Sequence, residues 1–178
     1  MSPEETKRVK LKQIYEALLR LLRDQPLTDI TVAALCREAG VSRTYYYRNF
    51  DSYQTIITRF QELAMRNYLR RVPRKRHLNF SALMTTYFAF AADRAAQTRL
   101  LVQAGLTATL IDTFRTVYTF LANADFIDSL ASARGRNPYF ATYLAGAVVA
   151  IEVKWIDEGM RETPANMGAM LGVLFGFD

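Results

Sequence analysis

Hydrophobic residues recur at three- and four-residue steps along nearly the whole chain, which is the spacing of one face of an α-helix. Between positions 4 and 24 the pattern is carried by Leu11, Ile14, Leu18, Leu21 and Leu22. Similar spacing predicts further helices at about 32–39, 43–49, 51–71, 79–94, 97–104, 107–122, 125–133, 138–158 and 164–175. No segment alternates between apolar and polar residues as a half-buried strand does. The sequence therefore predicts an all-α fold.

Helix-capping residues mark where three of these helices begin or end. Thr31 and Ser42 stand at the N-cap positions of the helices at 32–39 and 43–49, where a hydroxyl accepts a backbone N–H. Gly40 follows the first of them, at the place where a helix often ends in a left-handed residue. Asp51, with Gln54 three residues later, predicts a capping box for the helix that follows.

Proline marks the starts of two later helices and one domain boundary. Asn137-Pro138 and Thr163-Pro164 each place a capping residue before a proline, which suits the first helical position. Pro73 interrupts the charged segment 70–77 and disfavours helix there. We therefore expect an N-terminal helical domain at 1–50, a connecting helix at 51–72 and a second helical domain at 73–178.

The segment 31–50 carries the pattern with the clearest chemistry, and reads TVAALCREAGVSRTYYYRNF. Two short capped helices around a glycine turn predict a helix-turn-helix, whose second helix enters the DNA major groove. Tyr46 and Phe50 are one turn apart and should face the core. Three consecutive tyrosines cannot all do so, because neighbouring residues lie about 100° apart on a helix. The residues expected to face away carry hydroxyl and guanidinium groups, which bind phosphates and base edges: Arg43, Thr44, Tyr45, Tyr47 and Arg48.

Basic residues are concentrated in the first part of the chain. Residues 1–77 hold 16 of the 23 Lys and Arg residues and 8 of the 17 Asp and Glu residues, a formal charge of +8, whereas residues 78–178 carry −2. This asymmetry suggests a polyanion partner for the first domain. A solvated basic surface explains the charge equally well, and cations at a helix C-terminus explain the basic run at 70–77.

The run from Thr31 to Phe50 resembles the N-terminal signature of TetR-type regulators, and the likeness extends over roughly residues 8–60. The resemblance implies a homodimer whose two recognition helices enter successive major grooves of a near-palindromic operator. It implies that Thr31 and Ser42 approach phosphates and that Tyr47 binds one. Arg43, Thr44 and Arg48 are then the candidates for reading base edges.

Two positions depart from the signature. Tyr45 stands where the motif usually has a small hydroxyl residue, and Tyr53 stands where it usually has a phosphate-binding lysine. Both tyrosines can donate a hydrogen bond to a phosphate, so we expect both in the DNA interface. The missing lysine should weaken the salt-dependent part of binding.

The helix expected at 138–158 is apolar on more than one face, so it needs cover on two sides. Its own domain can supply one cover and a second subunit the other, as the last two helices do in TetR-type dimers; a core within one domain is the alternative. The interface candidates are Leu144, Ala145, Val148, Val149, Trp155, Met167, Met170, Leu171 and Leu174.

Aromatic residues are frequent in the second domain, and they suggest an enclosed site for an apolar or aromatic effector. Tyr87, Phe114 and Tyr118 are the candidates for its wall, because their hydroxyls or ring edges could orient a ligand. Ordinary core packing is the alternative explanation for each of them.

Other classes of function find little support. The single Cys36 excludes an internal disulfide and suits a core position, and His77 has no neighbours at metal-ligand spacing. No phosphate loop or nucleophile motif indicates an enzyme, and no cofactor or metal is expected. The longest strictly apolar run, 143–151, is far short of the roughly 20 residues that span a bilayer, so no membrane partner is expected.

The sequence thus predicts a cytoplasmic, nucleoid-associated regulator, a repressor that a small-molecule effector releases from double-stranded DNA. The alternative is a DNA-tethered interaction module of the adaptor or co-activator type, whose helical domain recruits a protein partner.

Overall fold

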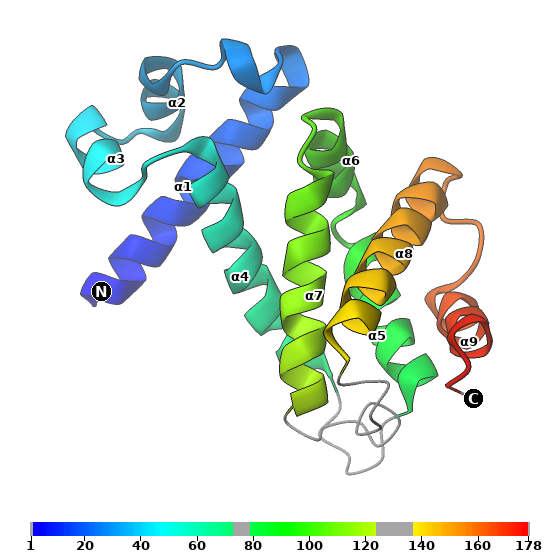
Figure 1. The fold of residues 1–178 in the computed structure, drawn as a ribbon. Helices are drawn as coiled ribbons and strands as arrows, with labels where there is room; N and C mark the ends of the chain where they lie inside the picture. Colours follow the sequence, from blue (N-terminus) through cyan, green and yellow to red (C-terminus); the bar gives the residue numbers. More distant parts are fainter. Residues whose placement is uncertain (1, 73–78, 124–136, 178) are drawn as a thin grey trace. The chain divides into compact units, whose positions relative to one another are not determined.

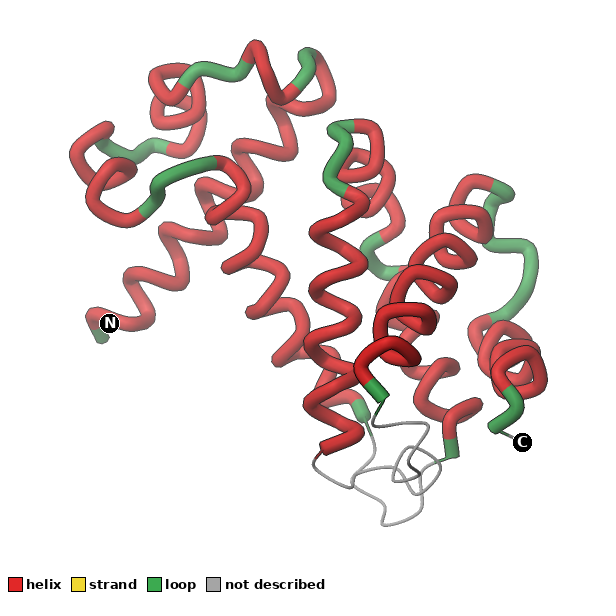
Figure 2. The backbone as a smooth tube through the Cα atoms, viewed as in Figure 1, coloured by secondary structure: helices red, strands yellow, loops and turns green. Residues whose placement is uncertain are grey.

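The computed structural model describes residues 2–72, 79–123 and 137–177. Every regular element in these ranges is helical (Figures 1 and 2), which confirms the predicted all-α fold. The predicted helix at 125–133 lies outside the described residues, as do Pro73 and His77. The chain divides into two compact units, Met1–Ala64 and Met65–Asp178.

Unit 1 contains α1 (Pro3–Asp24), the short 3-10 helix η1 (Leu27–Asp29), α2 (Val32–Ala39), α3 (Arg43–Asn49) and the first part of α4 (Tyr53–Arg71). Its centre is built from side chains with no exposed surface, Ile14, Leu18, Leu35, Ile56 and Ile57. The Tyr15 ring stacks on the Phe60 ring with their centres 3.7 Å apart. These contacts fix α1, α2 and α4 as the frame that carries α3.

The start of α4 differs from the predicted capping box. The Ser52 hydroxyl accepts the Thr55 backbone N–H at 3.2 Å, and α4 begins at Tyr53. Ser52 therefore caps this helix, and the prediction for Asp51 is wrong by one residue. A serine reaches the third backbone N–H of a helix as well as an aspartate does, so composition alone does not decide between adjacent candidates.

Unit 2 contains the rest of α4 with α5 (Phe80–Ala92), α6 (Ala95–Gln103), α7 (Thr107–Asn123), α8 (Pro138–Asp157) and α9 (Pro164–Phe175). α9 packs closely on α5 where Gly168 faces Thr85 and Ser81. A Cβ at Gly168 would lie 2.5 Å from the Ser81 carbonyl oxygen and 2.2 Å from the Thr85 hydroxyl. Only glycine permits this close approach of the two helices.

Both predicted cap-and-proline helix starts in unit 2 are confirmed. The Asn137 side chain accepts the Tyr139 backbone N–H at 2.9 Å, with Pro138 in the first turn of α8. The Thr163 hydroxyl accepts the Asn166 backbone N–H at 3.2 Å at the start of α9.

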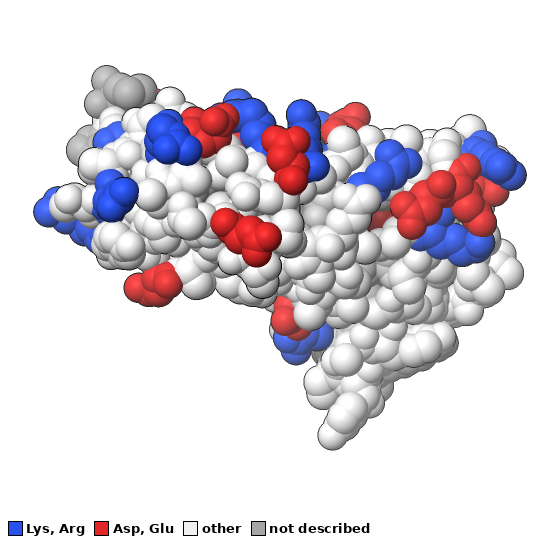
Figure 3. Space-filling view, turned by 90° about the horizontal axis from the view of Figure 1, so that it is seen from above, with Lys and Arg blue, Asp and Glu red and all other residues white. Residues whose placement is uncertain are grey.

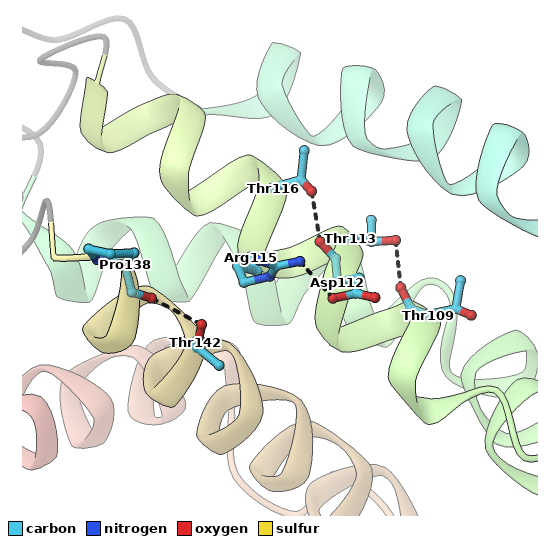
Figure 4. Close-up of polar contacts among 7 residues, drawn as sticks. All are labelled: Thr109, Asp112, Thr113, Arg115, Thr116, Pro138 and Thr142. Carbon is cyan, nitrogen blue, oxygen red and sulfur yellow. Dashed lines mark hydrogen bonds and ion pairs between the residues drawn. The ribbon is translucent and has the colours of Figure 1, made fainter.

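Polar side chains on α7 and at the start of α8 are satisfied within their own helices (Figure 4). Hydroxyl groups donate to the carbonyl four residues earlier, and one ion pair joins residues three apart. These bonds join Thr113 to Thr109, Thr116 to Asp112, Arg115 to Asp112 and Thr142 to Pro138. They hold the side chains along the helix that bears them.

Among the described residues, α8 is the one helix long and apolar enough to cross a membrane by length and composition. It is also a core helix, because 44% of its most apolar window is buried inside the chain. Two large residues of this helix, Tyr139 and Tyr143, lie outside the core and are exposed.

Candidate DNA interface and regulatory sites

The turn between α2 and α3 has the hydrogen bonds of a helix-turn-helix. The hydroxyls of Thr31 and Ser42 accept the Ala34 and Tyr45 backbone N–H groups, each at 3.1 Å. Gly40 takes a left-handed conformation with φ +65°, and the next N–H, of Val41, donates to the Cys36 carbonyl at 3.0 Å. This closure satisfies the last carbonyls of α2 and redirects the chain into α3. The three predicted capping roles of Thr31, Gly40 and Ser42 are confirmed.

The inner side of α3 is anchored by Tyr46 and Phe50, as predicted. Both side chains are buried, and their ring centres lie 5.9 Å apart. Burial raises the pKa of Tyr46 to about 12, because the ionised phenolate would lose its solvation there. Tyr46 is therefore a neutral core residue of unit 1.

The outer side of α3 presents five exposed residues, namely Ser42, Arg43, Thr44, Tyr47 and Arg48. Tyr47 contacts the Tyr46 ring edge-on, with the ring centres 5.4 Å apart, yet it leaves 66% of its surface exposed, which is unusual for a large aromatic side chain. Within the described residues, neither Arg43 nor Arg48 forms an ion pair or hydrogen bond with the protein. Both guanidinium groups are thus free to bind an external acceptor.

Tyr45 is half-buried and is paired with a cation from α1. The Lys10 ammonium lies 4.4 Å from the centre of the Tyr45 ring, a cation–π contact. Lys10 is 35 positions away in the sequence, so no local signal joins it to the motif. The contact adds a positive charge beside α3 that the sequence analysis did not identify.

Tyr53 does not present its hydroxyl hydrogen to the outside. Its hydroxyl donates to the Ile30 carbonyl at 2.5 Å and so links the start of α4 to the residue before Thr31. Burial is the main reason that its pKa is raised above the usual value. Since a phenol has one hydrogen to donate, this geometry does not support the predicted phosphate contact for Tyr53.

Arg59 and Asn49 hold the end of α3 in place. The Arg59 guanidinium donates to the Asn49 carbonyl at 2.8 Å, and the Asn49 side chain donates to the Tyr45 carbonyl at 2.8 Å. Arg59 also lies over the Phe50 ring at 5.4 Å. These contacts make Arg59 a structural cation, unlike Arg43 and Arg48.

Charge in unit 1 is more balanced than the sequence analysis of residues 1–77 indicated. Unit 1 holds 10 Lys and Arg and 8 Asp and Glu residues, so much of the basic excess follows Ala64. Figure 3 shows Lys and Arg interspersed with Asp and Glu, and an area of surface without charged side chains. Any affinity of unit 1 for a polyanion should therefore depend on a few placed cations more than on net charge.

Unit 2 contains a small, partly open apolar cavity whose wall includes all three predicted ligand residues. Tyr87, Phe114 and Tyr118 line it together with Met65, Tyr68, Leu83, Met84, Val117 and Leu121. The volume is about 10 Å³, room for one water at most. The three residues named from the sequence therefore line one cavity, which is too small for a ligand in this structure, and their role in ligand binding stays a prediction.

A carboxylate lies behind one wall of this cavity. Glu152 on α8 is 6% exposed, and Tyr87 donates a hydrogen bond to its Oε2 atom. Thr98 donates to its Oε1 atom at 3.3 Å. Burial raises the pKa of Glu152, while the hydrogen bonds from Tyr87 and Thr98 and the charge of Arg94 oppose that rise.

Most of the predicted dimer-interface residues lie in the core of the single chain. Seven of the nine are buried: Leu144, Ala145, Val148, Val149, Trp155, Met167 and Leu171. Because they already pack within unit 2, they offer almost no surface to a second subunit. Met170 and Leu174 remain exposed, next to large apolar residues that the prediction omitted: Tyr139, Tyr143 and Val173.

These five exposed residues lie on two helices, α8 and α9, and are here called the α8–α9 face. The two helices meet where the Tyr143 and Phe175 rings lie 5.9 Å apart. Tyr139 leaves 85% of its surface exposed and Val173 leaves 73%. The sequence could not separate this face from the core, because helix α8 is apolar on both sides.

Comparison with known proteins supports the fold. No protein-family model and no curated protein matches the sequence. The dihydroxyacetone kinase operon activator DhaS matches with a TM-score of 0.59 and 13% identity, over 93% of this chain and 93% of its own. A tetR-family transcriptional regulator from Streptomyces coelicolor matches with a TM-score of 0.56 and 18% identity, over 96% of this chain and 78% of its own. The chain therefore has the fold of TetR-family regulators, as the sequence motif predicted.

Proposed function

We propose that this protein is a DNA-binding transcription regulator that places α3 in the major groove. The observation that carries the proposal is the outer side of α3, where exposed Arg43, Arg48 and Tyr47 stand on a capped helix anchored by Tyr46 and Phe50. An exposed aromatic ring beside two guanidinium groups without protein partners is costly unless a partner covers it. Duplex DNA supplies both base edges and phosphates to such a surface.

The proposed DNA contacts fall into two groups, those to base edges and those to phosphates. Arg43 and Arg48 are assigned to base edges, with Arg43 bidentate to a guanine, and Thr44 reads an adjacent base. Thr31, Ser42 and Tyr47 are assigned to phosphates, since each hydroxyl can still donate its own hydrogen. Lys10 joins the phosphate contacts, and Tyr45 positions it through its ring.

The regulator acts as a homodimer that joins two copies through the α8–α9 face. Tyr139, Tyr143, Met170, Val173 and Leu174 are large apolar residues that water contacts in the single chain. A two-fold interface brings the same patch of each subunit together, so that each residue is buried twice. Two recognition helices related in this way match a near-palindromic operator.

The proposed regulatory step is release of DNA when a small molecule enters the cavity of unit 2. The lining by Tyr68, Tyr87, Phe114 and Tyr118 favours an apolar or aromatic ligand. We assign the protein as a repressor on this basis. DhaS, which has a similar fold, is named an activator, so the assay must read the sign of regulation. A cytoplasmic location follows from a role on DNA.

The test is a gel-shift and reporter experiment with the DNA upstream of the protein's own coding sequence. The full chain should bind that DNA at low salt, and a small-molecule extract should release it and change reporter expression. Arg43→Ala with Arg48→Ala should abolish the shift without changing the melting temperature. Release by a protein fraction only would favour the adaptor alternative, and no binding at all would refute the proposal.

A further inference from the structure

The polar centre of unit 2 takes no part in the DNA contacts or in the dimer face. It consists of Glu152 from α8, Tyr87 from α5 and Thr98 from α6, here called the Glu152 cluster. Each carboxylate oxygen accepts one hydroxyl hydrogen, and all three residues are buried. Three helices of the unit thus converge on one acidic side chain.

Packing does not explain an acid at this position. Removing a carboxylate from water is costly, and two hydroxyl donors together with the charge of Arg94 compensate only in part. A neutral amide or an apolar residue would serve the core at least as well. Groups retained at such a cost are candidates for function when they adjoin a cavity.

The Glu152 cluster adjoins the aromatic cavity through Tyr87. The ring of this residue forms part of the cavity wall, and its hydroxyl reaches back to Glu152. Its ring centre lies 4.9 Å from that of Phe114 and 6.0 Å from that of Tyr68, both in edge-to-face contact. Tyr118 completes the aromatic part of the wall. The Glu152 carboxylate is therefore hydrogen-bonded to one of the aromatic residues that line the cavity.

We infer that this cavity binds an organic ammonium cation with an apolar or aromatic body, and that Glu152 is its counter-ion. Aromatic faces attract a cation, and the buried Glu152 carboxylate, which two hydroxyls and the charge of Arg94 already stabilise, adds negative charge behind them. An anionic ligand would be repelled by this carboxylate. The inference rests on the proposed function, because it names the class of effector that the regulator receives.

Tyr87 links entry of the ligand to a change in the wall. The cavity of about 10 Å³ cannot hold such a molecule, so the rings must separate first. An ammonium group can replace the Tyr87 hydroxyl as the hydrogen-bond donor to Glu152, which frees the Tyr87 ring to turn. Met65 and Met84 line the same cavity and have flexible side chains that can repack around the ligand.

The experiment compares three ligands of matched shape by calorimetry on the full-length protein: phenylbutylamine, phenylbutanol and phenylbutyrate. The cationic amine should bind at least about tenfold more tightly than the neutral alcohol, and the anionic acid most weakly. Glu152→Gln should remove the preference for the amine and keep the affinity for the alcohol. Glu158→Gln is the matched control. It removes an exposed carboxylate at the C-terminal end of α8 and should keep the preference for the amine.

Three results would overturn the inference: equal affinity for the amine and the alcohol, an unchanged preference in Glu152→Gln, or no binding of any of the three at millimolar concentration. The comparison of ligands on the unaltered protein decides the matter even if Glu152→Gln fails to fold, which a circular-dichroism melt would reveal. DNA binding is measured in parallel without ligand. Its loss would sink the proposed function, whereas intact DNA binding with no preference for the amine sinks only the ligand class.

Discussion

Replacing Val173 on the α8–α9 face by lysine should convert the proposed dimer into a folded monomer. Val173 leaves 73% of its surface exposed in the single chain and lies in the last turn of α9. A cation near a helix C-terminus is compatible with the helix. The substitution therefore perturbs the proposed interface and leaves the fold of unit 2 in place.

The magnitude follows from exposure and symmetry. Full burial of a valine is worth roughly 1.5 kcal/mol at least, so covering the exposed part contributes about 1 kcal/mol in each subunit. An ammonium that loses part of its hydration adds a cost of about 1 kcal/mol or more in each. Because the two-fold interface contains the residue twice, the total is about 4 kcal/mol, or roughly a thousandfold in the dimer dissociation constant.

Sedimentation velocity over a range of protein concentrations measures this change, with a circular-dichroism melt as the check on folding. The matched control is Val149→Lys on α8, where the side chain is 1% exposed. A charge at Val149 should abolish the cooperative melt, because it puts an unpaired ammonium into the core. Val173→Lys should keep the melt and lose the dimer.

A Val173→Lys protein that sediments as a dimer with unchanged affinity would refute the assignment of the α8–α9 face. A folded monomer from Val149→Lys would instead show that the buried side of α8 meets the second subunit.

Three further predictions concern single contacts. Tyr53→Phe should lower the stability of unit 1 by about 1 kcal/mol in a urea melt, because the hydrogen bond to the Ile30 carbonyl is lost. The salt dependence of DNA binding should not change. A smaller salt slope in this variant would indicate that Tyr53 contacts a phosphate. Lys10→Ala should reduce the slope of log affinity against log salt by about 1, whereas Lys12→Ala should not. Burial raises the folded-state pKa of Glu152, so the folded state binds the proton more tightly and stability falls as pH rises from about 4.5 through that pKa. In urea melts, the free energy of unfolding of Glu152→Gln should not show this decrease with pH. The same pH profile in the variant and the unaltered protein would contradict the prediction.

Local signals in the sequence were sufficient for the helix-turn-helix. Thr31, Gly40 and Ser42 were assigned from residue type and spacing, and each makes the expected hydrogen bonds or turn. The same holds for the helix starts at Pro138 and Pro164, because caps and prolines act within one helical turn.

Contacts between distant residues could not be predicted in this way. The Lys10–Tyr45 pair and the bond from Tyr53 to the Ile30 carbonyl depend on how α1, α2, α3 and α4 pack. The buried position of Glu152 depends on three helices that meet in space. Periodicity also cannot tell which apolar side of α8 faces the core, so the sequence did not separate buried Val149 from exposed Tyr143.

The central claim is that α3 reads duplex DNA, and footprinting of the purified dimer on its bound sequence tests it most directly. The account predicts two protected half-sites separated by about one helical turn of 10–10.5 base pairs. Arg43→Ala should weaken binding about tenfold or more and relax the preference at one base position in each half-site. Failure to protect any duplex at low salt, or a footprint and base preference unchanged by Arg43→Ala, would contradict the claim.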